Sequence, residues 1–168
     1  MEEIKGLVSK KNKWLASQVE VDFPTAESIK GRELYQKAEE SCIYKQLTAC
    51  SESSVEGLEI HKADFHRLTV IFAQLQSTQF QGDESAWVLE FFAQIILSNE
   101  HDLYLGFIGQ KPVFAAIVSC EGTQFLVSDI AIAPENKLLS YQDVASQLAQ
   151  LLELDTKHTD IWFCNYEK

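Results

Sequence analysis

The stretch LYLGFIGQKPVFAAIVSCEGTQFLVSDIAIAPENK, residues 103–137, decides the fold of this 168-residue chain. This stretch contains three apolar runs typical of strands, at Leu103–Ile108, Val113–Ser119 and Phe125–Ala133. A glycine-containing turn at 109–112 joins the first two runs, and Glu121-Gly122 turns the chain into the third. Three strands linked only by tight turns predict an antiparallel meander.

Helices and single strands flank this meander. Upstream, residues 55–61 predict a strand, and Asp64 predicts the N-cap or first-turn acid of an amphipathic helix. The turn at 81–83 separates that helix from a second one with a wide apolar face. Downstream, a helix is predicted over Tyr141–Leu154 and a strand over Asp160–Tyr166. The fold class is therefore α/β (α+β), a mixed, largely antiparallel sheet flanked by helices.

The polar segment around residues 51–54 divides the chain into a leader, residues 1–52, and a core, residues 53–168, within one structural domain. In the leader, the sequence predicts a strand at 17–23, a helix at 26–38 and a strand at 42–47. Two arrangements stay open for this segment. It completes the sheet from the other end of the sequence, or it is an unrelated leader that packs as helices.

Charge restricts the partners that this chain can bind. The 14 Lys and Arg face 25 Asp and Glu, and the part from Leu68 onward carries −9 of the net −11. Such a surface repels phosphate backbones, which disfavours nucleic acid and favours a cationic ligand. No apolar run reaches the roughly 18 residues of a membrane span. The start of the chain lacks a signal-peptide pattern, so we expect a cytoplasmic protein without membrane contact.

The cysteines and histidines predict neither disulfides nor a metal site. Cys42, Cys50, Cys120 and Cys164 contain no C-x-x-C spacing, and without a secretory signal we expect reduced thiols. His61 and His66 flank an acidic residue, but no H-E-x-x-H is present and their elements need not converge. We therefore predict no metal.

The order of elements, the hairpin GFIGQKPVFAA and the strand end IAIAPENK resemble the GNAT superfamily of N-acyltransferases, over residues 55–166. The resemblance implies that acetyl-coenzyme A or another acyl-coenzyme A lies in a gap beside the strand 125–133. It implies that Ile132 and Ala133 bind the pantetheine arm, and that the following turn and helix start receive the pyrophosphate. By position, the resemblance assigns the following residues to the cofactor at this turn and helix start: Lys137, Ser140, Tyr141 and Gln142.

The turn before the last helix departs from the family pattern. The family has two spaced glycines there, so that the backbone can approach phosphates closely. Residues 137–143 contain no glycine, and Asp143 adds a carboxylate near the helix start. That carboxylate suits the helix dipole and opposes a bound phosphate.

In the resembled family, a general base takes a proton from the acceptor amine and an acid protonates the departing thiolate. Asp129, which interrupts the apolar strand, is the candidate base, with Glu121 as a candidate helper across the hairpin. Tyr141 and Tyr166 are the candidate acids. The alternatives are that Asp129 faces solvent or pairs with a lysine, and that the tyrosines merely cap an apolar surface.

Two functions follow from the resemblance. The first is an N-acyltransferase that moves an acyl group from acyl-coenzyme A to the amine of a small molecule or a protein. The second is a non-catalytic GNAT-like module that has lost coenzyme A binding and binds a ligand or a protein. A structural α/β domain with an accidental resemblance is a third reading. An exposed sheet edge would also allow a homodimer.

Overall fold

The computed structural model describes residues 2–52 and 54–166, and this part of the chain forms five helices and one six-stranded sheet. In chain order the elements are α1 (Glu2–Ser17), α2 (Ala26–Glu39), β1 (Cys42–Gln46), β2 (Leu58–Lys62), α3 (His66–Ser77), α4 (Asp83–Phe92), β3 (His101–Ile108), β4 (Lys111–Glu121), β5 (Gln124–Ile132), α5 (Tyr141–Leu151) and β6 (Asp160–Tyr166).

The strands follow the order β1-β6-β5-β4-β3-β2 across the sheet. Every neighbouring pair is antiparallel except β5 and β6, which run parallel because α5 crosses between them. The predicted meander is confirmed as β3, β4 and β5, and the predicted fold class is confirmed as well.

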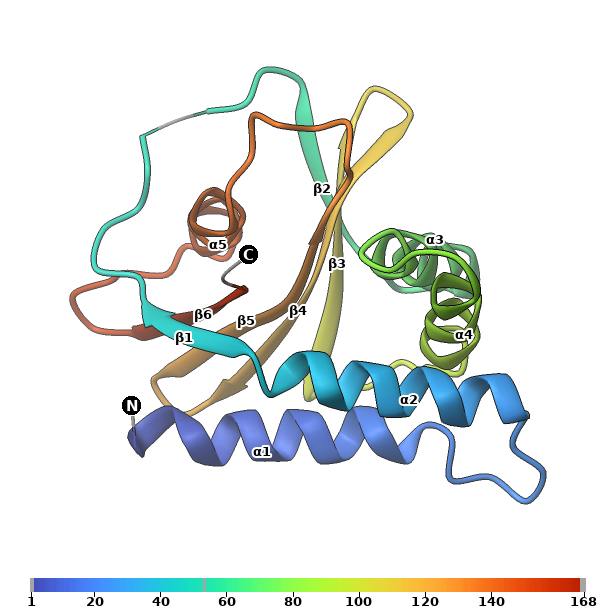
Figure 1. The fold of residues 1–168 in the computed structure, drawn as a ribbon. Coiled ribbons are helices and arrows are strands. Elements are labelled where there is room, and N and C mark those ends of the chain that lie inside the picture. The colour runs from blue at the N-terminus through green and yellow to red at the C-terminus, as the bar shows by residue number, and fades with distance from the viewer. Residues whose placement is uncertain (1, 53, 167–168) are drawn as a thin grey trace.

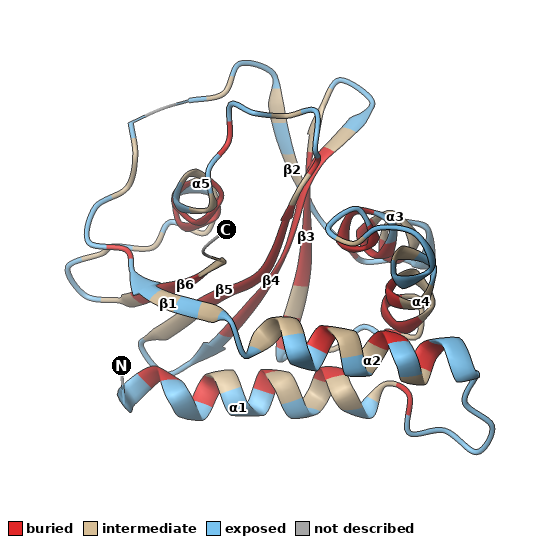
Figure 2. Ribbon diagram, in the orientation of Figure 1, coloured by how far each residue is buried: buried red, intermediate tan, exposed pale blue. Residues whose placement is uncertain are grey.

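Helices cover both faces of the sheet (Figure 1). On one face, α1 to α4 pack over the inward side chains of β3, β4 and β5, which form the largest buried cluster. On the other face, α5 buries a second cluster around Phe114, Val127 and Ile130. The buried residues therefore concentrate in the central strands and on the helix faces turned toward them (Figure 2).

The leader begins with a long helix, so the strand predicted at 17–23 is wrong. Ser17 ends α1, and residues 18–25 form turns and loop before α2. The buried positions of α1 are Ile4, Leu7, Lys11 and Leu15, a helical spacing in which a lysine takes an apolar place. The predicted helix and second strand of the leader are confirmed as α2 and β1.

β1 forms an edge of the sheet, antiparallel to β6, with Cys42 opposite Tyr166 and Tyr44 opposite Cys164. This pairing brings the Cα atoms of Cys42 and Cys164 to 5.9 Å, and a disulfide joins them. The prediction of reduced thiols is wrong for these two residues, because strand pairing across 122 positions cannot be read from local spacing. Cys50 and Cys120 are free.

Two further observations concern the remaining elements. Phe65 is the N-cap of α3 and the first turn of that helix holds no acidic residue, so Asp64 is neither the N-cap nor the first-turn acid that the sequence predicted. Among the described residues, every helix is too short or too polar to cross a lipid bilayer.

Candidate functional site

The parallel strands β5 and β6 separate part of the way along their length. They pair from Gln124 with Asp160 to Val127 with Phe163, and the pairing stops there. β5 continues to Ile132 and β6 to Tyr166. A V-shaped gap therefore opens between the carboxyl-terminal ends of the two strands, and side chains line it as a cleft.

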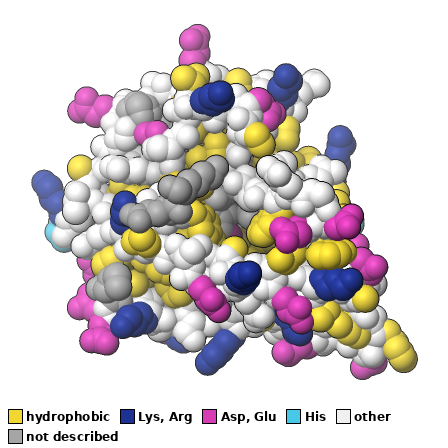
Figure 3. Space-filling model, viewed as in Figure 1, with side chains coloured by type: hydrophobic (Ala, Val, Ile, Leu, Met, Phe, Trp, Pro, Cys, Tyr) yellow, Lys and Arg dark blue, Asp and Glu magenta, His cyan; other side chains and the backbone are white. Residues whose placement is uncertain are grey.

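The cleft has a volume of about 530 Å³. Ile132 and Ala133 line it from β5 and the residue after it, and β6 contributes Phe163, Asn165 and Tyr166. Hydrophobic side chains gather around a hollow near the middle of this face, and charged side chains stand toward its rim (Figure 3).

Five of the six residues assigned to a cofactor line this cleft together: Ile132, Ala133, Ser140, Tyr141 and Gln142. Lys137 lies outside the lining. The lysine that lines the cleft is Lys45 of β1, which the sequence analysis did not single out. Only the pairing of β1 with β6 brings Lys45 to this edge, so no local signal marks it.

The N-terminus of α5 is capped by its own side chains. The Ser140 hydroxyl accepts the Asp143 N–H at 3.1 Å, and the Asp143 carboxylate accepts the Ser140 N–H at 2.9 Å. This capping box occupies N–H groups that an anion would need at the helix start. The Asp143 carboxylate also supplies the negative charge that the helix dipole favours there. Side chains of the helix start therefore take two of its N–H groups, those of Ser140 and Asp143.

Replacing Ser140 with alanine tests this cap. We expect the free energy of unfolding to fall by about 1 kcal/mol, because the Asp143 N–H loses its acceptor. Ser9→Ala, on the exposed face of α1, is the matched control and should not destabilise the protein. Denaturant unfolding compares the two. An equal change in the free energy of unfolding in the two variants would mean that the cap does not stabilise the protein.

Asp129 lies at a β-bulge where β5 leaves β6. Ile117 pairs with Ser128 and Ala115 with Ala131, so β5 carries one extra residue at this point. Asp129 takes a positive φ of 52°, a conformation that Asp adopts more readily than most residues. Side-chain alternation alone would put Asp129 on the α5 face with Val127. The bulge instead brings its carboxylate to α1, on the opposite face of the sheet.

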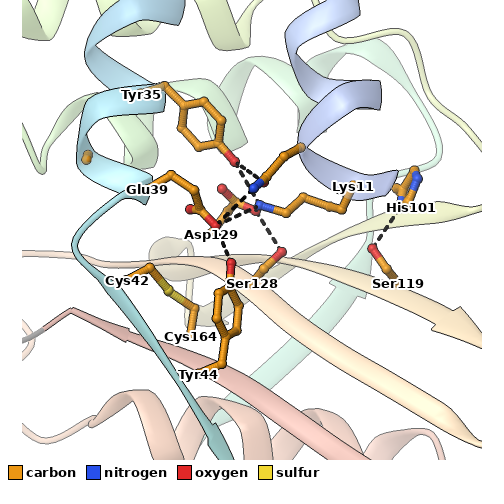
Figure 4. Close-up of polar contacts among 12 residues, drawn as sticks. Lys11, Tyr35, Glu39, Cys42, Tyr44, His101, Ser119, Ser128, Asp129 and Cys164 are labelled. Carbon is orange, nitrogen blue, oxygen red and sulfur yellow. Dashed lines mark hydrogen bonds and ion pairs between the residues drawn. A yellow bond between two sulfur atoms is a disulfide. The ribbon is translucent and has the colours of Figure 1, made fainter. Parts of the chain in front are cut away.

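The Asp129 carboxylate forms a buried ion pair with Lys11 (Figure 4). The Lys11 Nζ lies 2.8 Å from Asp129 Oδ2 and 3.7 Å from a Glu39 oxygen, and it donates to the Tyr35 hydroxyl at 2.7 Å. Ser128 donates to the same Asp129 oxygen at 2.7 Å. Lys11 is fully buried and Asp129 is 2% exposed. Asp129 therefore pairs with a lysine, which was one of the alternatives to its role as a catalytic base.

The tyrosines around this pair stay protonated. Burial, followed by the nearby Asp129 and Glu39 carboxylates, raises the pKa of Tyr35 and of Tyr166 well above the ordinary value. The Tyr166 hydroxyl donates to Glu39 at 3.3 Å, and Tyr44 donates to the other Glu39 oxygen. Burial also raises the pKa of Tyr141.

The structure brings the three candidate catalytic residues together at a second cavity of about 180 Å³. Asp129, Tyr141 and Tyr166 all line it, and the two tyrosines also line the larger cleft. Their rings lie 6.2 Å apart. Glu121 does not join them, since it lies at the far end of the β4–β5 hairpin as an exposed partner of Lys10.

Three residues at the centre of this cluster, Lys11, Tyr35 and Glu39, belong to the leader and were not assigned to the site from sequence. One signal pointed to the first of them. A lysine at a buried position of an amphipathic helix needs a buried acidic partner. Nothing local to α2 distinguishes Tyr35 or Glu39 from ordinary helix residues.

The side chains of Glu39, Cys42 and Cys164 also converge, with one ligand atom from each within 4.8 Å of the others. In this structure the two sulfurs bond to each other, and both Glu39 oxygens accept phenol hydrogens. The group therefore offers no free ligand set in the conformation described.

The chain matches no protein-family model and no curated protein. Its fold is similar to that of a GCN5-related N-acetyltransferase from Kribbella flavida, with a TM-score of 0.47 and 8% identity over 79% of this chain and 53% of the other. It is also similar to a proposed acetyltransferase from Pyrococcus horikoshii, with a TM-score of 0.40 and 17% identity over 67% of this chain and 40% of the other. The chain thus spans about half or less of each. Both similarities concern the fold alone.

Proposed function

We propose that the protein is an N-acyltransferase whose donor, an acyl thioester of coenzyme A, lies with its pantetheine arm in the cleft between β5 and β6. The observation that carries this proposal is the end of β5–β6 pairing at Val127 and Phe163. Beyond that point β5 has no strand neighbour on its β6 side among the described residues. The Asp129 and Ile132 carbonyls there accept hydrogen bonds from the Gln76 and Gln79 side chains, and the remaining backbone groups suit the amides of an extended arm.

The bound thioester would supply an activated acyl group, and residues of this chain would transfer the protons. In the transfer, the amine nitrogen bonds to the acyl carbon, the carbon–sulfur bond breaks and the thiol leaves. Asp129 would take the proton from the amine, and Tyr141 would give one to the thiolate. Tyr141 suits the second role better than Tyr166, because the Tyr166 hydroxyl already donates to Glu39.

The capped start of α5 supports a donor site that holds the pantetheine arm more than the nucleotide. We therefore expect S-acetylpantetheine and acetyl-coenzyme A to bind with affinities within about tenfold of each other, since a pyrophosphate gains little at that helix. Isothermal titration calorimetry measures both. Absence of binding by either at millimolar concentration would overturn the proposal.

A pair of variants locates the donor. Gln142→Trp places a large ring on an exposed position that lines the cleft, and we expect it to abolish donor binding. Gln74→Trp makes the same change on an exposed position of α3 outside the cleft lining, and should leave binding unchanged. Equal affinities in the two variants would place the donor elsewhere.

The second candidate function is a non-catalytic module that binds a ligand or a protein without coenzyme A. Two observations favour it: the α5 cap, and the pairing of the candidate base with Lys11. If the folded protein gives no binding heat when it is titrated with either thioester, that result would support this function over the first.

A further inference from the structure

A carboxylate and two sulfur atoms meet where α2 passes into β1. Glu39 ends α2, Cys42 begins β1, and Cys164 lies on β6, the strand that pairs with β1. One ligand atom from each of the three side chains lies within 4.8 Å of the others (Figure 4). Carboxylate oxygen and thiolate sulfur are both ligands that Zn²⁺ takes in proteins.

The disulfide between Cys42 and Cys164 makes this group depend on the redox state. A dithiol that reduces the S–S bond is itself oxidised to a disulfide, and its two hydrogens leave both cysteines as thiols. The two Cα atoms are 5.9 Å apart. In a tetrahedral zinc site the two sulfurs lie about 3.8 Å apart. Rotation of the two side chains reaches that separation while β1 and β6 stay paired.

Glu39 can supply the oxygen without giving up its present partners. Among the described residues, its carboxylate accepts three hydrogen bonds, from Asn12, Tyr44 and Tyr166. A carboxylate has about four lone-pair sites, so one remains for a metal ion. Glu39 also lines an open groove of about 300 Å³. That groove gives an ion a path to the cluster and room for a water as the fourth ligand.

Charge favours the ion only when both cysteines are thiolates. Zn²⁺ with two thiolates is neutral, so replacing the two thiol protons with the ion leaves the net charge of the buried cluster unchanged. The Lys11 ammonium, 3.7 Å from a Glu39 oxygen and 2.8 Å from Asp129, keeps both carboxylate partners. A cation added beside the intact disulfide would face Lys11 without those thiolates.

We propose that Glu39, Cys42 and Cys164 bind one Zn²⁺ ion when the disulfide is reduced. The ion then joins β1 to β6 in place of the S–S bond, so this edge of the sheet stays closed in both redox states. The site requires no thioester and is independent of the proposed function.

The test compares the full chain in its two redox states at pH 7. A water-soluble phosphine reduces the disulfide, becomes the phosphine oxide and is removed before Zn²⁺ is added. We expect the reduced protein to retain one Zn²⁺ per chain after dialysis and the oxidised protein to retain none. Co²⁺ in place of Zn²⁺ should give the thiolate-to-metal absorption band in the reduced protein alone. Equal metal content in the two states would overturn the proposal.

Substitutions in the reduced protein locate the ion. Cys42→Ser and Cys164→Ser should each weaken Zn²⁺ binding more than about tenfold, because a serine hydroxyl does not ionise as a thiol does. Glu39→Gln should also weaken it. Cys50→Ser and Cys120→Ser, at the two free cysteines, are the matched controls and should leave the affinity unchanged. An equal loss in these controls would place the ion elsewhere.

Circular dichroism separates metal binding from unfolding. If the reduced chain stays folded and takes up no Zn²⁺, the proposal is wrong. If reduction loosens the fold, Zn²⁺ should restore the spectrum of the oxidised protein, because an ion that joins β1 to β6 stabilises the folded state. A spectrum that Zn²⁺ does not restore would overturn the proposal as well.

Discussion

Lys11→Met is expected to lower the free energy of unfolding by about 3–5 kcal/mol, because it leaves two acidic side chains in the interior without their cation. Lys11 is fully buried, and the side chain of Asp129 is 1% exposed. Methionine keeps the length and apolar character of the lysine stem, so the loss reports the charge more than the packing. Urea unfolding at pH 7 measures the change.

The neighbouring lysine provides the matched control. Lys10 pairs with Glu121 on the surface, where both side chains are more than half exposed. Lys10→Met should have a far smaller effect, because water and salt screen an exposed pair. Adding Asp129→Asn to Lys11→Met should recover part of the lost stability. If Lys11→Met cost no more than Lys10→Met, the buried ion pair would not be a main support of the fold.

Gly31→Ala is expected to destabilise the protein by at least about 1–3 kcal/mol, the usual cost of forcing an extra group into a packed contact. A Cβ atom at Gly31 would lie 2.0 Å from the backbone oxygen of Trp87 and 2.7 Å from the Cβ of Phe91. Backbone cannot rotate aside, so α2 would have to move away from α4. That movement would shift Tyr35 and Glu39, which α2 carries into the site.

Gly6→Ala is the control for this substitution. Gly6 lies in α1, where an added Cβ would meet nothing within 4 Å, so alanine should stabilise the helix by about 0.5–1 kcal/mol. Thermal and urea unfolding should therefore give opposite signs for the two glycines. A Gly31→Ala protein as stable as the unmodified one would show that α2 and α4 do not pack as closely as described.

The sequence predicted those parts of the fold that depend on local signals. The turns at 109–112 and 121–122 separate three apolar runs, and the confirmed meander follows from them. α5 and β6 were also predicted with nearly correct bounds, because their apolar periods differ clearly. The cleft residues from Ile132 to Gln142 were assigned through the family resemblance, and five of the six line the cleft because they follow one another along the end of β5 and the start of α5.

The parts that were missed depend on contacts between distant segments. α1 was not predicted, because Lys11 interrupts its apolar stripe, and that lysine makes sense only beside Asp129. The side of the sheet on which Asp129 lies depends on a bulge that no motif announces. The disulfide required knowledge that β1 pairs with β6. The local pattern of a sequence indicates where a residue lies within its helix or strand. It does not indicate which distant residue that side chain contacts in the fold.

The placement of β1 beside β6 has a consequence for how the protein is made. During translation, β1 leaves the ribosome long before its only strand neighbour among the described residues, because β6 is the last element of the order. The meander can form from nearby segments, but the edge strand must wait for a partner at the opposite end of the chain. Contacts of such long separation form slowly. Until β6 is made, β1 has no strand to pair with and Glu39 lacks the Tyr166 hydroxyl that donates to it.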